Sequence, residues 1–382
     1  MTTTRNRFQG SLLGVRIGDA LGMPFEILTP EQIEKITGVG GVVTFWDPQQ
    51  HRTDAPEWAQ KLKALRPGEC TDDWQLTMAG ALSLVDCSRL YLPSLAAAYT
   101  VEMRRSDLGW GGTTKASVRE LECWFNTDGQ DGRSPDQFAP FPKNAKRGYG
   151  CGNGVAMRIA PFGLALCRIY DPQGRMPPRA LEPFQEFIWK VGGLTHPDPR
   201  ATIAAFAVAS LIARLASHDG DPLTREELMA FMGDLLYQTI YMENKLGNRV
   251  RMPIRTQNFS ERLARVKPVV EAGLDAREIR ERLGTSSFAL ESVPFALATF
   301  LRHPTDFRAA LKEAVEAGGD TDTNAAIVGS LVGANVGVDG IPMPWRRFRH
   351  DFEVPVLLGT RLYRASAGIT RSVIAHRPKE LP

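Results

Sequence analysis

Apolar residues recur every three or four positions along most of the chain, and this spacing is typical of one face of an α-helix. It predicts helices at residues 10–21, 74–85, 201–215, 225–245, 259–270, 288–301, 307–317 and 325–336. The segment ATIAAFAVASLIARL, at 201–215, is apolar on nearly every side, which favours a helix buried at the centre of a bundle. A short β-like pattern occurs at residues 42–45. We therefore predict an all-α fold.

The pattern contains no linker that would divide the chain into independent halves. We expect one compact multi-helix domain over residues 1–375, followed by a tail at 376–382. A polar stretch at about 126–148, rich in Gly, Pro, Asp and Lys, is predicted to be a surface insertion. A shorter loop is predicted at 219–224.

Composition and missing motifs exclude several classes of function. The 382 residues carry 46 Lys and Arg against 43 Asp and Glu, so the net charge of +3 gives no reason to expect a stable nucleic-acid partner. No apolar run approaches the roughly 18 residues that cross a bilayer, and the N-terminus lacks an apolar signal core, so we expect no membrane partner and a cytoplasmic location. Because CxxC, HExxH, GxSxG and Walker motifs are absent, carboxylate chemistry remains.

The first group of carboxylates is Thr71-Asp72-Asp73, directly before a helical pattern. One interpretation is an N-cap, in which Thr accepts a backbone N–H and the acids favour the helix dipole. A cap does not require both acids, however, and adjacent carboxylates repel unless a cation neutralises them. Both interpretations stay open for this turn.

The second group, GGDTDTNAAIVGSLVGANVG, contains Asp320, Asp322 and Thr323. Alternating acids in a tight loop can direct two carboxylates at one point, and the Thr hydroxyl adds a neutral oxygen. Capping alone leaves the second Asp unexplained. The small residues that follow, such as Gly329 and Gly333, would allow another helix to approach closely.

Both acidic turns precede predicted helices, so they could face each other in the fold. Four carboxylates and two hydroxyls would then form an all-oxygen site suited to two Mg²⁺ or Mn²⁺ ions. Without metal, such a cluster would cost several kcal/mol or force protonation.

Five segments in this order carry a resemblance to a known family: GSLLGVRIGDALGMPFE from Gly10, GECTDDWQLTMA from Gly68, DLGWGGTTKASV from Asp107, GYGCGNGVAMRIAPFGL from Gly148, and GGDTDTNAAIVGSLVGANVG from Gly318. They resemble the ADP-ribosylglycohydrolases, which include the dinitrogenase reductase-activating glycohydrolase and the ADP-ribosyl-acceptor hydrolases. The resemblance implies an all-α domain with two Mg²⁺ or Mn²⁺ ions in a central cleft.

The resemblance also implies a role for individual residues. Its metal-ligand positions are occupied by Thr71, Asp72, Asp73, Asp320, Asp322 and Thr323. Its catalytic candidates are Glu26, beside the metal site, Asp107, which matches an acid assigned to proton transfer, and the metal-ligand residue Asp320. Its ligand-binding positions are Gly148, Tyr149, Gly150, Cys151, Gly152, Asn153, Gly154, Met157 and His196. A Gly-rich turn offers backbone N–H groups to a diphosphate.

One departure concerns the usual TDDT motif, which becomes TDDW here, so that Trp74 replaces the second Thr. The coordinating hydroxyl is expected from Thr71, so the metal site should survive. Trp74 would then either line the cleft or fill the core.

The resemblance implies metal-dependent hydrolysis of an ADP-ribosyl glycosidic bond, which builds positive charge at the anomeric carbon and needs an acid for a poor leaving group. The substrate would be an ADP-ribosylated protein, nucleic acid or small molecule. Two other hypotheses stay open: an inactive, crystallin-like relative that binds ADP-ribose or a nucleotide, and a metal hydrolase that acts on a different bond. The segments at 47–67 and 126–148 are where acceptor specificity could differ.

Overall fold

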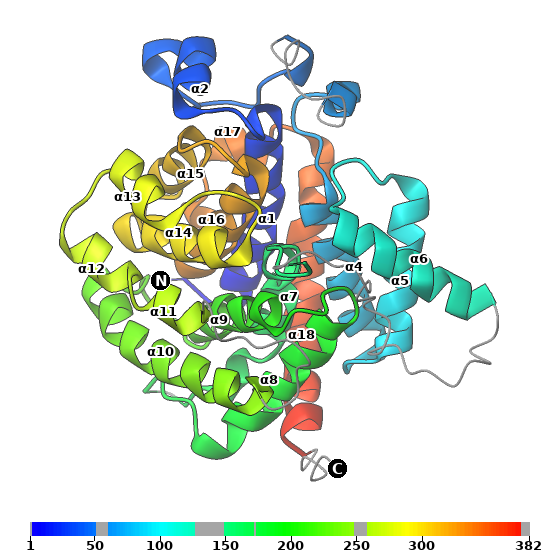
Figure 1. The fold of residues 1–382 in the computed structure, drawn as a ribbon. Coiled ribbons are helices and arrows are strands. Elements are labelled where there is room, and N and C mark those ends of the chain that lie inside the picture. The colour runs from blue at the N-terminus through cyan, green and yellow to red at the C-terminus, as the bar shows by residue number, and fades with distance from the viewer. Residues whose placement is uncertain (1, 51–59, 127–148, 172, 248–257, 376–382) are drawn as a thin grey trace.

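Helices account for most of the chain in the computed structural model, which describes residues 2–50, 60–126, 149–171, 173–247 and 258–375 (Figure 1). The longer helices are α1 (Thr4–Gly22), α4 (Asp72–Cys87), α5 (Leu92–Arg105), α6 (Gly112–Asn126), α8 (Pro178–Gly193), α9 (Pro199–Leu215), α10 (Arg225–Gly247), α14 (Ala289–Arg302), α15 (Phe307–Glu316), α16 (Thr321–Val336) and α18 (Glu353–Ala375). The shorter ones are α2 (Pro30–Thr37), α7 (Ala160–Ala165), α11 (Phe259–Leu263), α12 (Val266–Glu271), α13 (Ala276–Leu283) and α17 (Met343–Arg346). Short 3₁₀ turns include η1 (Met23–Phe25), η4 (Lys61–Ala64), η6 (Ala156–Arg158) and η9 (His350–Phe352).

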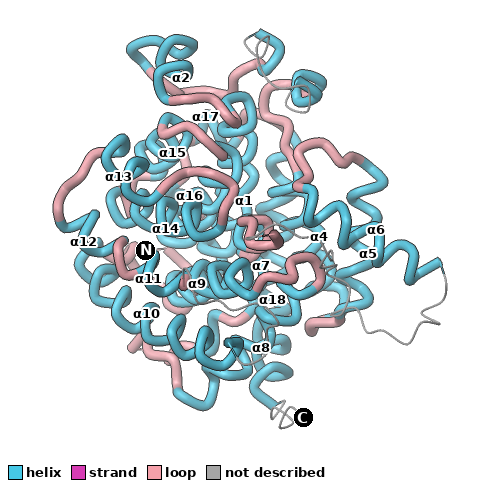
Figure 2. Tube along the Cα trace, in the orientation of Figure 1, coloured by secondary structure: helices cyan, strands magenta, loops and turns pink. Residues whose placement is uncertain are grey.

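The predicted all-α class is confirmed, because the described residues form no sheet and fold as one domain (Figure 2). The β-structure predicted from the pattern at 42–45 was wrong, because these residues form a loop. The indole of Trp345 donates a hydrogen bond to the Val43 carbonyl, and Phe45 packs against Phe348 with ring centroids 4.4 Å apart. Phe45 is therefore buried against a ring from a distant part of the chain, Val43 stays exposed, and the segment does not pair with a neighbouring strand.

One predicted helix is divided in two. The expected element at 259–270 consists of α11 and α12, which meet around Arg265. Pro268 explains the break, because a proline ring in a continuous helix would clash with the carbonyl of Ala264, four residues earlier.

The antiparallel pair of α1 and α16 lies at the centre of the molecule (Figure 1). A Cβ atom added to Gly14 would lie 2.0 Å from the Gly329 carbonyl oxygen, and one added to Gly333 would lie 2.1 Å from the Gly10 carbonyl oxygen. The two backbones are therefore in direct contact, which confirms the predicted role of the small residues in α16. Larger side chains at these positions would force the helices apart.

This pairing brings the end of α1 to the beginning of α16, since a Cβ atom added to Gly22 would lie 2.3 Å from the Thr321 carbonyl oxygen. Helix α4 also packs against α1, and its first turn faces the same point. Around this centre, α4, α5 and α6 lie on one side, whereas α10 to α15 lie on the other (Figure 1). The start of α4, the end of α1 and the start of α16 therefore meet.

The predicted insertion at 126–148 begins at the last residue of α6, and its residues 127–148 lie outside the described part of the chain, as does the tail at 376–382. The domain boundaries stay a prediction. Within the described residues, none of the helices combines the length and the apolar character that a membrane span requires.

Candidate active site

Asp19, on α1, is a buried carboxylate that the sequence analysis did not single out. Its carboxylate accepts hydrogen bonds from the backbone N–H of Thr71, at 3.0 Å and 3.1 Å, and from that of Trp74, at 3.0 Å. The hydroxyl of Thr71 also donates to it, at 2.9 Å. Among the described residues, Asp19 rather than a side chain of α4 itself thus caps the start of α4. Thr71 does occupy the N-cap position with both acids in the first turn, but its side chain accepts no backbone N–H, so that part of the capping interpretation was wrong.

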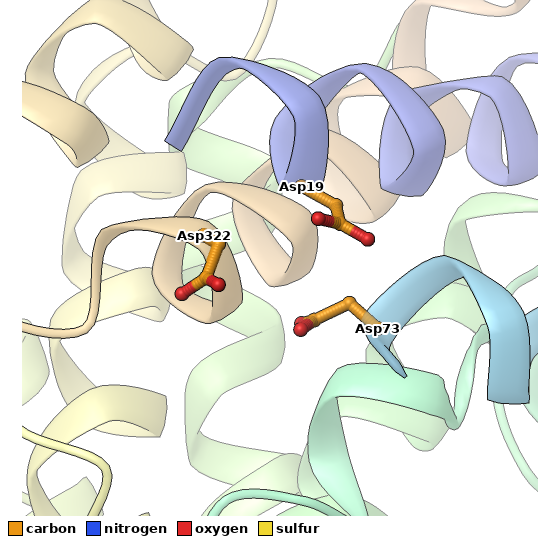
Figure 3. Close-up of side chains that lie close together, drawn as sticks. All are labelled: Asp19, Asp73 and Asp322. Atoms are coloured by element: carbon orange, nitrogen blue, oxygen red, sulfur yellow. The ribbon is translucent and has the colours of Figure 1, made fainter. Parts of the chain in front are cut away.

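The carboxylates gather in two triads. Asp19, Asp73 and Asp322 form the first, and Glu26, Asp320 and Asp322 form the second; one oxygen of each residue lies within 4.8 Å of the others in its triad. Figure 3 shows the first triad, with side chains from α1, α4 and α16 pointing toward one another. Because Asp322 belongs to both, the two triads are adjacent.

The turn before α16 is held by two glycines in the left-handed region, Gly318 at φ +71° and Gly319 at φ +83°. A Cβ atom on Gly318 would lie 2.5 Å from the Leu28 carbonyl oxygen, so the close approach also requires glycine. The backbone N–H of Asp320 donates to the Thr285 carbonyl oxygen at 2.9 Å. These contacts fix Asp320 and Asp322 against the chain that carries Glu26.

The hydroxyls of both acidic turns point at one carboxylate. Thr71 Oγ1 and Thr323 Oγ1 each lie 3.4 Å from Asp73 Oδ2. The other oxygen of this carboxylate, Asp73 Oδ1, is buried and has no hydrogen-bond partner among the described residues. A buried carboxylate oxygen without a partner is costly, so it is suited to contact a ligand such as a cation.

Burial and mutual repulsion make the cluster hard to ionise. Burial, followed by the charge of Asp19, raises the pKa of Asp72 to about 7. The pKa values of Asp73 and Asp322 are raised well above the ordinary value, again by burial first and then by neighbouring carboxylates. The pKa of Asp19 is raised by burial, although its hydrogen bonds from Thr71 and Trp74 oppose the shift. Divalent cations would relieve this repulsion, and the all-oxygen donor set suits Mg²⁺ or Mn²⁺.

A cavity of about 480 Å³ opens beside the cluster. Its wall contains these predicted site residues: Glu26, Asp72, Asp73, Asp107, Gly152, Asn153, Gly154, Met157, His196, Asp320, Asp322 and Thr323. The amide of Asn153 donates to Asp320 at 2.8 Å, so the glycine-rich loop is joined directly to the acidic cluster. The cavity can therefore hold a ligand in contact with both.

Other predicted residues do not reach this wall. Thr71 lies behind it, bonded to Asp19. Of the described residues predicted to bind ligand, Tyr149, Gly150 and Cys151 lie outside the wall. The Cys151 thiol is buried in the apolar core, and burial raises its pKa, so it is unreactive. Gly148 lies outside the described residues. Ligand binding by these four residues stays a prediction.

Asp107 lies at the cavity mouth and forms an ion pair with Lys115 at 3.0 Å. The hydrogen bond from Lys115 lowers the pKa of Asp107, and its side chain is half-exposed. An ionised carboxylate of this kind can accept a proton but is a poor proton donor at neutral pH. Its predicted catalytic role is therefore better suited to a base than to an acid.

Trp74, which replaces the second Thr of the motif, is buried outside the cavity wall. Its ring lies 6.0 Å from the guanidinium carbon of Arg16, which also forms an ion pair with Asp351 at 2.8 Å. Of the two alternatives for this residue, the structure thus favours core packing.

The comparisons with known proteins agree with one another. The sequence pattern of the family described as ADP-ribosylglycohydrolase matches residues 1–371. ADP-ribosylhydrolase ARH3 of Homo sapiens is 26% identical over 374 residues, which cover 94% of this chain and 93% of that protein. ADP-ribosyl-(dinitrogen reductase) glycohydrolase of Rhodospirillum rubrum is 23% identical over 343 residues, with 90% of each chain covered. A solved structure described as "ADP-ribosylglycohydrolase-related protein complex" has a TM-score of 0.56 at 24% identity and covers 95% of this chain and 99% of its own, which shows a similar fold.

Proposed function

Because the chain belongs to the ADP-ribosylglycohydrolase family, we propose that it hydrolyses an ADP-ribosyl glycosidic bond and releases ADP-ribose from a modified acceptor. One structural observation supports this proposal above the others. Two carboxylate triads that share Asp322 adjoin a cavity of about 480 Å³, and a glycine-rich loop forms part of its wall. An inactive relative would have no need to retain so unfavourable a cluster of buried acids.

The residues present fit a pair of hard divalent cations. Asp19, Asp73 and Asp322 could hold one, and Glu26, Asp320 and Asp322 the other. The unpartnered Asp73 Oδ1 and the raised pKa values of the cluster both support this assignment. Bound there, Mg²⁺ or Mn²⁺ would orient sugar hydroxyls and polarise a water.

The protein's own groups would orient the substrate and transfer protons. The loop containing Gly152, Asn153 and Gly154 lines the cavity beside Asp320, where it would place the ADP-ribosyl group against the acids. A poor leaving group needs a proton as the bond breaks. We assign this transfer to Glu26 or Asp320 rather than to Asp107, whose pKa is lowered by Lys115.

The acceptor is expected to contact the cavity mouth. Lys61, from the segment at 47–67, lines the cavity together with Asp107 and Lys115. These charged groups lie where a leaving group would exit. Exchange of this segment should therefore alter acceptor preference more than affinity for ADP-ribose.

The test is a hydrolysis assay of metal-free protein supplied with Mg²⁺ or Mn²⁺ and a panel of ADP-ribosylated arginine, serine, nucleic-acid and small-molecule substrates. Asp322→Asn should abolish ADP-ribose release, since it removes a charge from both triads. Asp339→Asn, on the exposed surface, should keep wild-type activity. Release of AMP or phosphate in place of ADP-ribose would refute the proposed bond, as would full activity of Asp322→Asn.

A further inference from the structure

The predicted ligand residue His196 is held by a chain of hydrogen bonds behind the cavity wall. Its Nδ1 lies 2.9 Å from the hydroxyl of Thr195, and that hydroxyl accepts a hydrogen bond from Nη2 of Arg158. All three side chains are buried. Neither of these two contacts involves the acidic cluster.

The donors and acceptors of this chain fix the direction of its protons. A guanidinium can only donate, so Thr195 Oγ1 must accept from Arg158. The hydroxyl oxygen has a second lone pair, but if it accepted from Nδ1–H as well, the buried hydroxyl hydrogen would have no acceptor, because no other described acceptor is bonded to that hydroxyl. The hydroxyl hydrogen is therefore assigned to Nδ1 of His196. A neutral imidazole that accepts at Nδ1 carries its proton on Nε2.

The free edge of the ring faces the ligand space. A Cβ atom added to Gly154 would lie 3.1 Å from His196 Nε2, and one added to Gly152 would lie 3.6 Å from it. Both glycines line the cavity, as His196 does. No described residue is hydrogen-bonded to Nε2, so this nitrogen is available to a ligand.

The surroundings keep the ring uncharged. Burial, and then the positive charge of Arg158, lower the pKa of His196 to about 3. Arg158 itself is anchored twice more: Nη1 donates to the Gly154 carbonyl, and the guanidinium carbon lies 5.1 Å from the ring centroid of Tyr99. We call Arg158, Thr195 and His196 the relay. Through Arg158 and the Gly154 carbonyl, the relay is also bonded to the glycine-rich loop.

We propose that Arg158 and Thr195 are positioning residues that lock His196 in the Nε2–H tautomer, so that a neutral imidazole donates a hydrogen bond to an oxygen of the bound ligand. The identity of that ligand, the ADP-ribosyl group, rests on the proposed function, whereas the tautomer does not. In the relay, Arg158 acts as an electrostatic and geometric support and does not contact the cavity. Although Arg158 is positively charged, it is bonded to groups behind the cavity wall and does not lie where it could contact a phosphate in the cavity.

The first test is the ¹⁵N spectrum of histidine-labelled, ligand-free protein, with the His196 signals assigned by their loss in His196→Asn. We expect a protonated Nε2 and a bare Nδ1, unchanged between pH 6 and pH 8, because the pKa of His196 is lowered to about 3. A protonated Nδ1, or a ring that titrates in this range, would overturn the proposal. This measurement needs neither metal nor substrate, so it stands even if the protein does not act on ADP-ribose.

The second test removes the central hydroxyl. Thr195→Val should mix the two tautomers and weaken binding of ADP-ribose, measured by calorimetry, about tenfold; Thr195→Ser should restore both. Thr202→Val is the matched control, because the Thr202 hydroxyl is buried without a hydrogen-bond partner among the described residues. A Thr195→Val protein with the wild-type spectrum would contradict the relay. If wild-type protein fails to bind ADP-ribose while the spectrum is as expected, the proposed function fails and the relay holds.

Discussion

Asp19 shows how a single carboxylate can organise a site without lying in the cavity wall. It accepts the backbone N–H groups of Thr71 and Trp74 and the Thr71 hydroxyl, so its negative charge replaces an ordinary cap at the start of α4. The same carboxylate lies within 4.8 Å of Asp73 and Asp322. Asp19 therefore both orients the first acidic turn and adds charge to the acidic cluster.

We predict that Asp19→Asn weakens Mn²⁺ binding about 10- to 100-fold, as is typical when a group that orients metal ligands is lost. The substitution removes one negative charge. The NH₂ group of the new amide would also face the backbone N–H of Thr71 or Trp74, so that two hydrogen-bond donors would face each other. Calorimetric titration with Mn²⁺ measures the effect. The control is the surface variant Asp339→Asn, and equal affinities of Asp19→Asn and wild type would show that Asp19 has no such role.

At the scale of single residues, the sequence predicted the two acidic turns but not the side chains that hold them in place, such as Asp19. Asp320, Asp322 and Asp73 are conspicuous because acids follow one another before helices. Asp19 stands alone in a helix, and its value depends on a turn 52 positions away that only the fold brings near. The available signal was an acid among small residues, in a segment otherwise suited to close packing.

At the scale of elements, the contact between α1 and α16 sets the distance between Asp19 on α1 and Asp322 on α16. Every fourth residue of α1 from Gly10 to Gly22 is a glycine, and each faces the backbone of α16. A methyl group at Gly14 would lie 2.0 Å from the Gly329 carbonyl oxygen, which neither backbone can accommodate without moving. The residues that carry chemistry at the ends of these helices would move with them.

Gly14→Ala is therefore expected to destabilise the protein by about 1–3 kcal/mol or more and to lower affinity for Mn²⁺ as well. Chemical denaturation and metal titration measure the two effects. Gly233→Ala on α10 is the matched control: the residue is exposed, nothing lies within 4 Å of its Cβ position, and the change should stabilise the helix by about 0.5–1 kcal/mol. If both variants gain stability, the contact between α1 and α16 is looser than described.

Prediction of elements succeeded where the apolar pattern was strong and failed where it was not. Helix α9 is buried along almost its whole length and was predicted within two residues. Helix α6 buries only Thr114, Ser117, Val118 and Leu121 among its described side chains, so its apolar face is too narrow to recognise. Helix α8 contains Pro183, which usually ends a helix and here lies inside one.

At the scale of the whole molecule, the buried acids make stability depend on pH. An acid whose pKa is raised in the folded state binds its proton more tightly when folded, so stability increases as pH falls. For Asp72 this window extends from the ordinary value of 3.8 to about 7. Asp73 and Asp322 shift in the same direction.

We therefore expect metal-free protein to become more stable, by on the order of 1 kcal/mol or more, as pH falls from 7.5 to 5.5, because the three acids with raised pKa values outweigh His196, whose lowered pKa acts in the opposite direction. Saturating Mn²⁺ should reverse this trend, because bound cations stabilise the ionised acids and compete with protons. Thermal unfolding in EDTA and in Mn²⁺ measures the difference. A metal-free protein that loses stability over the same range would mean that these acids are ionised without metal.

Arg7 connects distant parts of the molecule. Its buried guanidinium donates to the carbonyl oxygens of His218, Gly220, Asp221, Ala334 and Asn335, which joins the start of α1 to the loop before α10 and to the end of α16. Burial lowers the pKa of Arg7 to about 10, so it stays charged at neutral pH.

Arg7→Met should lower the free energy of unfolding by roughly 3 kcal/mol or more, since several buried carbonyls would lose their donors. The cleft would keep its residues, so Mn²⁺ affinity of the folded protein should be unchanged. Arg361→Met, which removes an exposed arginine paired with Asp86, should cost less than about 1 kcal/mol. Equal urea midpoints for the two variants would contradict the structural role of Arg7.

The pairing of α1 with α16 also has a consequence during synthesis. The glycine-lined face of α1 is synthesised roughly 300 residues before its partner α16, a delay of about 15–60 s at ordinary elongation rates. For that period the nascent chain exposes backbone that is destined for the innermost contact of the fold, and it lacks the carboxylates of α16. A product that ends before α16 should therefore lack both the contact between α1 and α16 and the Asp322 carboxylate that the two triads share, and it should be more sensitive to proteases than the full chain.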